Sequence, residues 1–434
     1  MTALRHLAHL LRGQWFRRLF AVRIASQLSD GVFQVALASY VVFSPERAPG
    51  PGAIAGALAV VLLPFSVLGP FVGVFLDRWS RRQVLAWSNF VRVGLVGALA
   101  VAVHADLRGP GLLALVLVCL SVNRFLLAGL SASLPHVVDD ADLVTANSLT
   151  PTAGTLAVLV GLALGTGARL GWQRAGVDSD AGVLVTAAAM YAVAGCLALR
   201  IPRDLLGPDV PVPPPPVRQA VGHVVAGLVG GLRHLEQRRA AAYGLLAIGA
   251  HRFLFGISTV SMILLFRNHF FGPGQEDQAF AQLSLAVLVS GAGFVLAAFL
   301  TPVVTEHVTP RTWVVALLLG AAVTQVFPGA LYTRPALMVA AFCLGVVSQG
   351  VKIVVDTLVQ TNVDDEFRGR VFALYDVIFN VAFVAAAAVA AVVLPVSGRS
   401  YVVLVATAVG FALTGLWYAR VSQPTGATHG AVAG

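Results

Sequence analysis

The sequence predicts an all-α, polytopic membrane protein with twelve transmembrane helices in two six-helix bundles. Its 434 residues are 58% hydrophobic and only 11% charged, and the mean hydropathy is +0.84. About a quarter of the residues in soluble chains are charged, so this chain lacks the polar surface of a water-soluble protein. The number of helices follows from twelve apolar runs of membrane-spanning length. The division into two bundles follows from a proline-rich interruption after the sixth run.

The twelve apolar runs are each near the ~20 residues that a helix needs to cross a bilayer. Lipid offers no partner for backbone N–H and C=O groups, so each run is expected to be helical. Because twelve is even, both termini are expected on the same side of the membrane. The runs cover residues 19–43, 52–76, 84–105, 111–134, 144–170, 181–200, 241–266, 279–303, 312–331, 336–361, 370–394 and 401–419.

The placement of the arginines indicates which side that is. Outside the apolar runs or within two residues of their ends, seventeen arginines fall on the side of the N-terminus and seven on the other side. Arginine-rich short loops stay in the cytoplasm, so both termini are predicted to be cytoplasmic. The formal net charge of +9 is therefore explained by topology, without a nucleic-acid partner. The seven arginines on the other side are Arg47, Arg108, Arg169, Arg174, Arg267, Arg334 and Arg399.

A linker separates the sixth run from the seventh. It holds seven of the 22 prolines, which exclude a helix there and favour a stiff, extended chain. The following stretch, Arg218 to Arg239, has an apolar side, so we expect a helix lying on the membrane surface. The chain is thus divided into a first bundle at 1–200, a cytoplasmic linker at 201–240, and a second bundle with a short cytoplasmic tail at 241–434. The apolar side comprises Val221, Val224, Val225, Leu228 and Leu232.

The two halves of the sequence resemble each other. Val138-Asp139-Asp140 follows the fourth run, and Val363-Asp364-Asp365 follows the tenth, 225 residues later. A weaker similarity links residues 73–82, after the second run, with residues 302–311, after the eighth. Two six-helix repeats related by an axis along the membrane normal are a transporter architecture, with the site near the bilayer midplane between them.

The first run carries a polar stripe. Arg23, Gln27, Asp30 and Gln34 recur at helical spacing, so one side of this helix is polar and cannot face lipid. Asp30 lies about 11 residues from the cytoplasmic end, or ~16 Å at helical rise, close to mid-membrane. A carboxyl group at that depth can carry a proton during transport. Two alternatives remain open at this point: a permanent ion pair with a neighbouring arginine, and contact with a substrate.

Other charged residues also lie deep in the apolar runs. The predicted substrate cavity combines Gln27 and Gln34 with Arg124, Arg252 and Lys352. The cations in the runs outnumber the acids by two, which favours an anionic group on the substrate. The alternative is that some arginines reach the interface or bond to backbone carbonyls. The cations counted are Arg23, Arg92, Arg124, Arg252 and Lys352, and the acids are Asp30, Asp356 and Asp376.

A second group of polar residues is predicted to form a structural or gating network. Lys352 and Asp356 are four residues apart in the tenth run and can pair within one helix. Asp376 and Asn380 have the same spacing in the eleventh run. We expect Arg92, Asp356, Asp376 and Asn380 to belong to this network, and contact with substrate is the alternative role.

Several kinds of chemistry lack a sequence signature. The phosphate-binding loop Gly-x-x-x-x-Gly-Lys-Ser/Thr is absent, as are the zinc-protease and serine-hydrolase motifs. Cys119, Cys196 and Cys343 are far apart in the sequence and lie within apolar runs, which argues against a disulfide framework or a metal site. The sequence therefore predicts no enzyme activity and no cofactor.

Five stretches of the sequence resemble the major facilitator superfamily. The pattern Gly73-x-x-x-Asp77-Arg78-x-x-Arg81-Arg82 resembles the signature loop between its second and third helices. Arg124 with Gly129 resembles its fourth-helix motif, and Gly161-x-x-x-Gly165-x-Gly167 resembles part of the antiporter motif. Residues 146–149 and 368–374 are similar to bacterial exporters of the macrolide-efflux and enterobactin-exporter branch.

This resemblance implies a function as well as a fold. It implies the major facilitator fold and proton-coupled export of an amphipathic small molecule, such as a drug, a siderophore or another metabolite. It also implies a cytoplasmic gate at Gly73, Asp77, Arg78, Arg81 and Arg82. The expected partners are the substrate, protons and membrane lipids, for a monomer in the bacterial inner membrane. The alternatives are a facilitator or importer of the same fold, and a lipid-moving or non-transporting membrane protein.

Overall fold

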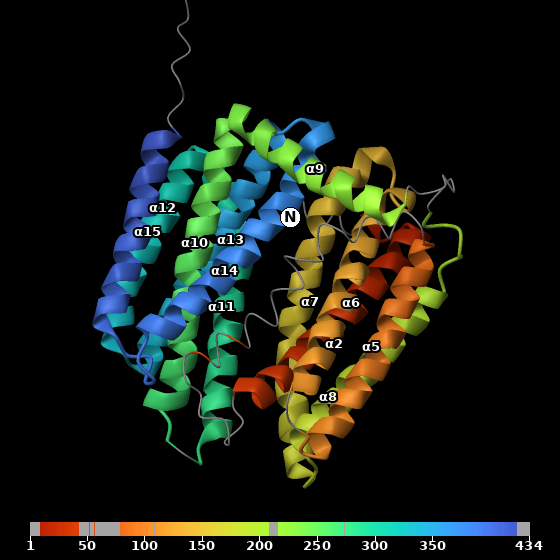
Figure 1. Cartoon of the computed structure of the whole chain (residues 1–434), viewed down its shortest axis with the longest axis horizontal. Helices are drawn as coiled ribbons and strands as arrows, with labels where there is room; N and C mark the ends of the chain where they lie inside the picture. The colour runs from red at the N-terminus through yellow and green to blue at the C-terminus, as the bar shows by residue number, and fades with distance from the viewer. Residues whose placement is uncertain are drawn as a thin grey trace, which may run out of the picture.

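The computed structural model describes residues 9–42, 52, 56, 79–107, 110–207, 216–272 and 274–422. Within these ranges every regular element is a helix and no strand occurs, as the sequence predicts (Figure 1). The predicted second run, 52–76, lies outside the described residues except at two positions. The predicted gate residues Gly73, Asp77 and Arg78 lie outside them as well.

The helices follow the predicted apolar runs. Ten helices of the described part of the chain are long and apolar enough to cross a membrane. The polar stripe of α2 lowers its hydropathy, and α2 is not among the ten. The number of twelve crossings therefore stays a prediction. The helices are α2 Gln14–Val42, α5 Arg81–His104, α6 Pro110–Ala132, α7 Asp140–Arg174, α8 Ser179–Leu199, α9 Val217–Gln237, α10 Arg239–Leu264, α11 Glu276–Thr305, α12 Pro310–Val326, α13 Arg334–Asn362, α14 Asp365–Val393 and α15 Tyr401–Val421.

The helix ends differ from the predicted ones by a few residues, because local hydrogen bonds set them. The Asp178 side chain accepts hydrogen bonds from the first N–H groups of α8, and Ser400 caps α15 in the same way. The largest difference at a C-terminal end is in the predicted run 312–331. There α12 ends at Val326, and the remainder is an extended residue followed by a 3₁₀ turn, Gly329–Leu331.

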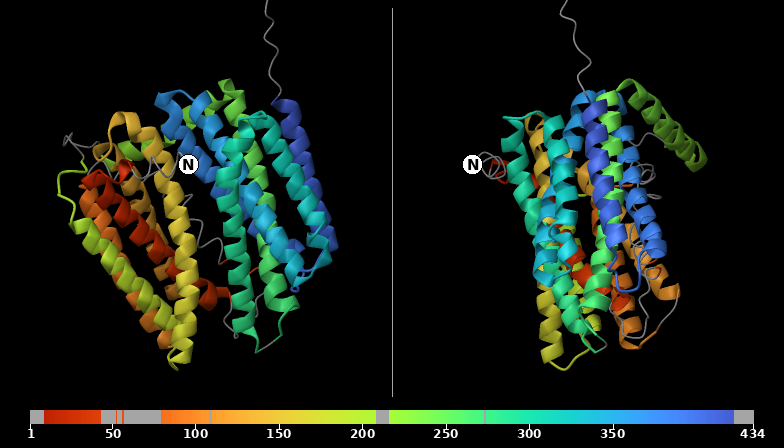
Figure 2. Two further views of the ribbon diagram at one scale, coloured as in Figure 1. Left: turned by 180° about the vertical axis from the view of Figure 1, so that it is seen from behind. Right: turned by 90° about the vertical axis from the view of Figure 1, so that its left-hand side faces the viewer.

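The helices pack in two groups. The first group consists of α2, α5, α6, α7 and α8. The second group consists of α10, α11, α12, α13, α14 and α15. The groups stand side by side in Figure 1 and in the left view of Figure 2. Helix α2 packs against α7 and α8, and α10 packs in the same way against α14 and α15. Likewise, α5 packs against α6 and α8, and α12 packs against α13 and α15. The repeat in the sequence thus recurs as a repeat in packing.

Aspartates mark equivalent positions in the two groups. Asp139 is the residue before α7, and Asp364 is the residue before α14. Both have an extended backbone, with φ near −69° and −62°. The matching Val-Asp-Asp segments of the sequence therefore start corresponding helices of the two groups.

Glycines hold α2 close to α7. A Cβ atom added at Gly161 would lie 2.2 Å from the backbone oxygen of Leu28, and one at Gly31 would lie 2.2 Å from that of Val158. A Cβ atom added at Gly165 would lie 3.0 Å from the Cα atom of Val32 of α2. Small residues let helix backbones approach in this way. The Gly-x-x-x-Gly spacing in α7 is thus accounted for by packing.

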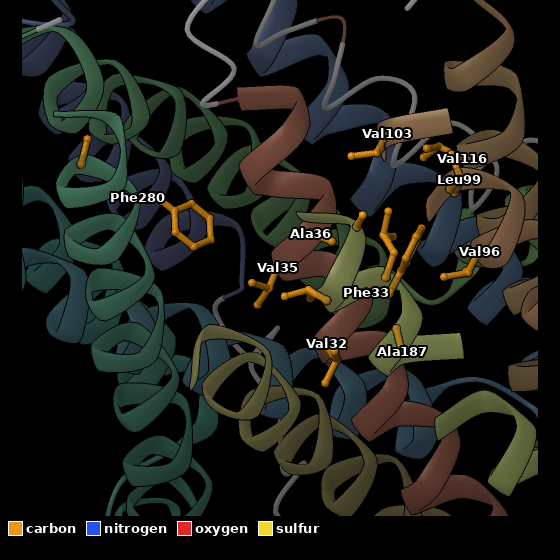
Figure 3. Close-up of a cluster of buried hydrophobic side chains, with 14 of the residues drawn as sticks. Val32, Phe33, Val35, Ala36, Val96, Leu99, Val103, Val116, Ala187 and Phe280 are labelled. Atoms are coloured by element: carbon orange, nitrogen blue, oxygen red, sulfur yellow. The ribbon is translucent and has the colours of Figure 1, made fainter. Parts of the chain in front are cut away.

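One hydrophobic cluster joins the two groups at the end of the molecule away from α9. Phe33, Val35 and Ala36 of α2 belong to the same buried cluster as Phe266 and Phe280 of the second group. Figure 3 shows Phe280 of α11 facing the α2 side chains, with Val35 nearest to it. Apolar packing therefore connects the groups at this end.

Helix α9 is the predicted amphipathic linker helix. It lies across one end of the other helices (Figure 1), and we call this end the α9 end. Val225, Val229 and Leu232 are 49%, 43% and 53% exposed, as expected for a helix with one side in the membrane surface. Arg238, directly after α9, donates two hydrogen bonds to Asp364, at 2.7 and 2.9 Å. This contact fixes the linker to the start of α14.

Candidate functional site

Asp30 lies inside the first group of helices. Its Oδ1 accepts hydrogen bonds from Nη1 of Arg92 on α5, at 2.6 Å, and from the hydroxyl of Tyr191 on α8, at 2.7 Å. The Arg92 side chain is 0% exposed and that of Asp30 is 8% exposed. The carboxylate thus lies between α2, α5 and α8 of one group.

The other donors of Arg92 are also engaged. They bond to Asn123 Oδ1 at 2.9 Å, Asn89 Oδ1 at 2.8 Å and the Ser88 carbonyl at 3.2 Å. The guanidinium lies 4.1 Å from the centre of the Tyr191 ring. A buried ion pair is stabilised where further hydrogen bonds compensate its charges, and here Asp30 Oδ1 accepts two hydrogen bonds while Arg92 donates to three further oxygens. This geometry favours the ion-pairing alternative for Asp30, and a proton-carrying role remains a prediction.

The remaining polar residues of α2 differ in exposure. Arg23 and Gln27 are buried like Asp30, as the polar stripe predicts, but Gln34 is exposed. Gln27 lies against Gly154 of α7, and its Oε1 has no hydrogen-bond partner among the described residues. Because Gln27 packs against its own group, its role as a cavity residue also remains a prediction.

An ion pair crosses from one group to the other. Nη2 of Arg124 on α6 lies 3.3 Å from Oδ2 of Asp376 on α14. The Arg124 side chain is 18% exposed and the Asp376 side chain 57%. By helical rise, Asp376 is ~16 Å from the α9 end of α14, near the middle of the bundle. Asn380 donates to the backbone oxygen of Asp376, at 2.7 Å, so it supports the helix and not the ion pair.

Lys352 and Asp356 form the ion pair that their spacing predicts. The Lys352 Nζ lies 2.6 Å from Asp356 Oδ2. The same ammonium is 5.7 Å from the centre of the Tyr375 ring. Tyr375 directly precedes Asp376 on α14. The Lys352–Asp356 pair of α13 and Arg124 of α6 therefore contact neighbouring residues of α14.

Arg252 of α10 lies among aromatic rings. Its Cζ is 4.2 Å from the centre of Phe379, 4.4 Å from that of Phe383 and 5.5 Å from that of Phe255. Its Nε is buried without a hydrogen-bond partner in the described part of the chain. Phe379 and Phe383 belong to α14, four and eight residues after Tyr375.

The side of α14 between Tyr375 and Phe383 is therefore the centre of the candidate site, and we call it the α14 face. The structure brings the predicted residues Arg124, Arg252, Lys352, Asp356, Asp376 and Asn380 to this face. It does not bring Asp30 or Arg92 there. The sequence analysis missed Tyr375, Phe379 and Phe383, although their spacing of four residues is a helical stripe beside Asp376 and Asn380.

Comparison with known proteins agrees with this architecture. No protein-family model matches the chain. Two proteins described as uncharacterised MFS-type transporters, from Mycobacterium tuberculosis and Mycobacterium bovis, are each 36% identical over 389 residues, or 89% of this chain and 86% of each relative. The chain belongs to the major facilitator superfamily. It is a multi-pass membrane protein whose relatives are named as transporters and not as enzymes.

Solved structures share the major facilitator fold of this chain. A mutant of the nucleoside transporter NupG has a TM-score of 0.68 at 12% identity, over 94% of this chain and 99% of that one. The POT family transporter PepTSo has a TM-score of 0.68 at 12% identity, over 93% and 97%. These likenesses show the fold. The narrower resemblance to macrolide and enterobactin exporters is not supported by them.

The gate motif of this major facilitator chain is described only in part. Arg81 donates to the carbonyls of Ala132 and Leu206, at 2.9 and 3.2 Å, and Arg82 to that of Ile201, at 3.2 Å. Ala132 is the last residue of α6, and Ile201 and Leu206 follow α8, so all three acceptors belong to the first group. Within the described residues these arginines thus fix loops of their own group at the α9 end, and a gate between the two groups remains a prediction.

At the opposite end, Arg169 of α7 bridges the two groups. Its Nη1 lies 2.7 Å from Asp277 of α11, and its Nε lies 3.1 Å from Asp180 of α8. Its guanidinium is 4.9 Å from the centre of the Phe280 ring. Together with the hydrophobic cluster of Figure 3, this contact holds the two halves of the major facilitator fold together at the end away from α9.

Proposed function

We propose that this chain is a secondary active transporter that exports amphipathic small molecules from the bacterial cytoplasm in exchange for protons. Its units are a six-helix bundle at 1–200, a linker at 201–240 and a second bundle at 241–434. The two bundles alternate between states open to either side of the membrane. The observation that carries this proposal is the Arg124–Asp376 ion pair between the groups.

The ion pair supports alternating access because of its depth. Arg124 and Asp376 meet near the middle of the bundle, whereas Arg169 and Asp277 meet near the end away from α9. When the bundles separate at one end and close at the other, contacts at different depths break and form in turn. A substrate that competes for Arg124 would favour one of these states.

The same pair supports coupling to protons. The Asp376 side chain is 57% exposed within the protein, and protonation would remove the charge that holds Arg124. The sequence analysis assigned this role to Asp30, whose carboxylate is already bound by Arg92 and Tyr191. We therefore propose Asp376 as the proton-coupling residue and Asp30 as a structural one.

The direction of transport rests on resemblance. Residues 146–149 and 368–374 are similar to bacterial exporters, and we take export as the direction on that basis. The relatives support transport only, since their names give neither a substrate nor a direction. The substrate is proposed to be amphipathic because aromatic rings lie beside charged groups on the α14 face.

Reconstituted proteoliposomes test this function. We expect an imposed pH gradient to drive accumulation of a fluorescent amphipathic dye, with proton movement reported by a pH-sensitive dye trapped inside. Asp376→Asn is expected to abolish the gradient dependence. Asp204→Asn, in an exposed loop after α8, is the matched control and should leave transport unchanged.

Other outcomes point to the alternatives. Equilibration of the dye without any effect of the pH gradient would identify a facilitator. Movement of labelled lipid between leaflets without a gradient would identify a lipid-moving protein. Full gradient-driven transport by Asp376→Asn would remove Asp376 from the coupling mechanism.

A further inference from the structure

The three cations at the α14 face differ in their partners. Arg124 is paired with Asp376, and Lys352 is paired with Asp356. No ion pair or hydrogen bond joins Arg252 to any residue in the described part of the chain. The two pairs are neutral overall, so Arg252 leaves one positive charge at this face without a counter-ion.

The surroundings of Arg252 stabilise its positive charge but leave its N–H donors without acceptors in the part of the chain that the structure describes. Phe255, Phe379 and Phe383 place aromatic rings within 5.5 Å of its Cζ, which is favourable for a cation. Phenylalanine rings accept no ordinary hydrogen bond, however, and a guanidinium has five N–H donors. The buried Nε has no partner among the described residues. A charged side chain deep in a membrane protein needs a polar partner, and the described residues offer Arg252 aromatic rings only.

The neighbouring residues supply no anion to Arg252. His251, on the same helix, is 1% exposed and packs against Phe255 and Phe411. Both of its ring nitrogens lack hydrogen-bond partners in the described residues. Tyr375, on the facing helix, lies beside Lys352. The surroundings of Arg252 are therefore aromatic and positively charged.

We propose that Arg252 binds an anionic group of the transported molecule, and that the rings of Phe255, Phe379 and Phe383 hold the apolar part next to it. A planar guanidinium can donate two parallel hydrogen bonds to a carboxylate or a sulfonate, which makes those groups the best match. The inference rests on the proposed transport of amphipathic small molecules and narrows the substrate class to amphipathic anions.

Three compounds with one skeleton and different head groups test this inference. Phenylbutyrate, phenylbutyramide and phenylbutylamine carry a negative, a neutral and a positive group on the same phenylalkyl chain. Binding to the purified full chain in a neutral detergent is measured by calorimetry and by the shift in thermal unfolding, up to about 10 mM. We expect phenylbutyrate to bind at least roughly tenfold more tightly than the amide, and the amine most weakly.

The variants separate the head-group contact from the aromatic contacts. Arg252→Gln should remove the preference for phenylbutyrate, and Arg252→Lys should weaken it without reversing it. Phe379→Leu should lower affinity for all three compounds by a similar factor. The matched control is Arg399→Gln, because Arg399 also lies over two aromatic rings, those of Tyr332 and Tyr401, but away from the α14 face.

Three results would overturn the inference. They are equal binding of the three compounds, no binding of phenylbutyrate up to about 10 mM, and an unchanged preference in folded Arg252→Gln. Gradient-driven transport without any head-group preference would overturn this inference and leave the proposed function standing. A head-group preference that depends on Arg252, in a chain that transports nothing, would support this inference and contradict the proposed function.

Discussion

Asp30 and Arg92 form a buried ion pair 2.6 Å long between α2 and α5, and Tyr191 of α8 donates a second hydrogen bond to the same carboxylate oxygen. Three helices of the first group thus share one polar contact in their interior. Because the Arg92 side chain has no exposed surface, its charge depends on this carboxylate for compensation.

Asp30→Asn is therefore expected to destabilise the protein. Removing one partner of a buried pair leaves the other charge uncompensated, which typically costs about 3–5 kcal/mol. Thermal unfolding in detergent measures the loss, and the double variant Asp30→Leu/Arg92→Met should recover part of it. Unchanged stability together with loss of pH-dependent transport would show instead that Asp30 carries the proton.

Arg169→Ala is expected to loosen the contact between the two halves at the end away from α9. Arg169 contacts Asp277 and Phe280 of α11, and Asp277 is 68% exposed, so we expect only a modest shift, of roughly a few-fold, toward separation. The readout is labelling of Ala279→Cys, a position 1% exposed, in a chain without its native cysteines.

The control for Arg169 is Arg174→Ala, because Arg174 lies on the same helix and is exposed. A membrane-impermeant thiol reagent should label Ala279→Cys faster in Arg169→Ala and at the unaltered rate in Arg174→Ala. Equal labelling rates in all three backgrounds would show that Arg169 does not hold the halves together.

The contact between the linker and α14 is expected to depend on acid pH. The hydrogen bonds from Arg238 lower the pKa of Asp364 below its ordinary value of 3.8. A carboxyl group with a depressed pKa in the folded state contributes its stabilisation above the ordinary pKa and loses it as the pH falls through the lowered value. Docking of α9 through this contact should therefore weaken below about pH 4.

Hydrogen exchange of residues 217–237 measures this docking. Arg238→Ala should raise exchange in α9 at neutral pH, where the unaltered chain is protected. Arg218→Ala, at the far end of the same helix and exposed, is the control and should not change it. Exchange that is equal in Arg238→Ala and the unaltered chain at all pH values would contradict the role of this contact.

The helices were predictable from the sequence because the membrane imposes them. Apolar runs of about 20 residues must be helical in lipid, and the structure places a helix at every described run. Contacts within one helix were predictable for the same reason, as the Lys352–Asp356 pair shows. The exact helix ends were not predictable, because capping side chains such as Asp178 and Ser400 determine them, whereas hydropathy does not.

The partners of polar side chains on different helices were not predictable from spacing. The stripe on α2 shows that Asp30 avoids lipid, but it cannot tell whether Asp30 faces its own group of helices or the other one. That choice is made by Arg92 and Tyr191, which lie 62 and 161 residues away in the sequence. The aromatic surroundings of Arg252 likewise come mostly from α14 and not from α10.

Alternating movement of the two halves is the central claim, and a reversible cross-link tests it most directly. Gly291 of α11 packs against Leu159 of α7, and a Cβ atom added there would lie 2.7 Å from Leu159 Cδ2. The variant Leu159→Cys/Gly291→Cys, without native cysteines, places a thiol on each half. We predict that oxidation stops gradient-driven transport, that a reductant restores it, and that each single variant is unaffected. Undiminished transport by the fully cross-linked chain would contradict the account.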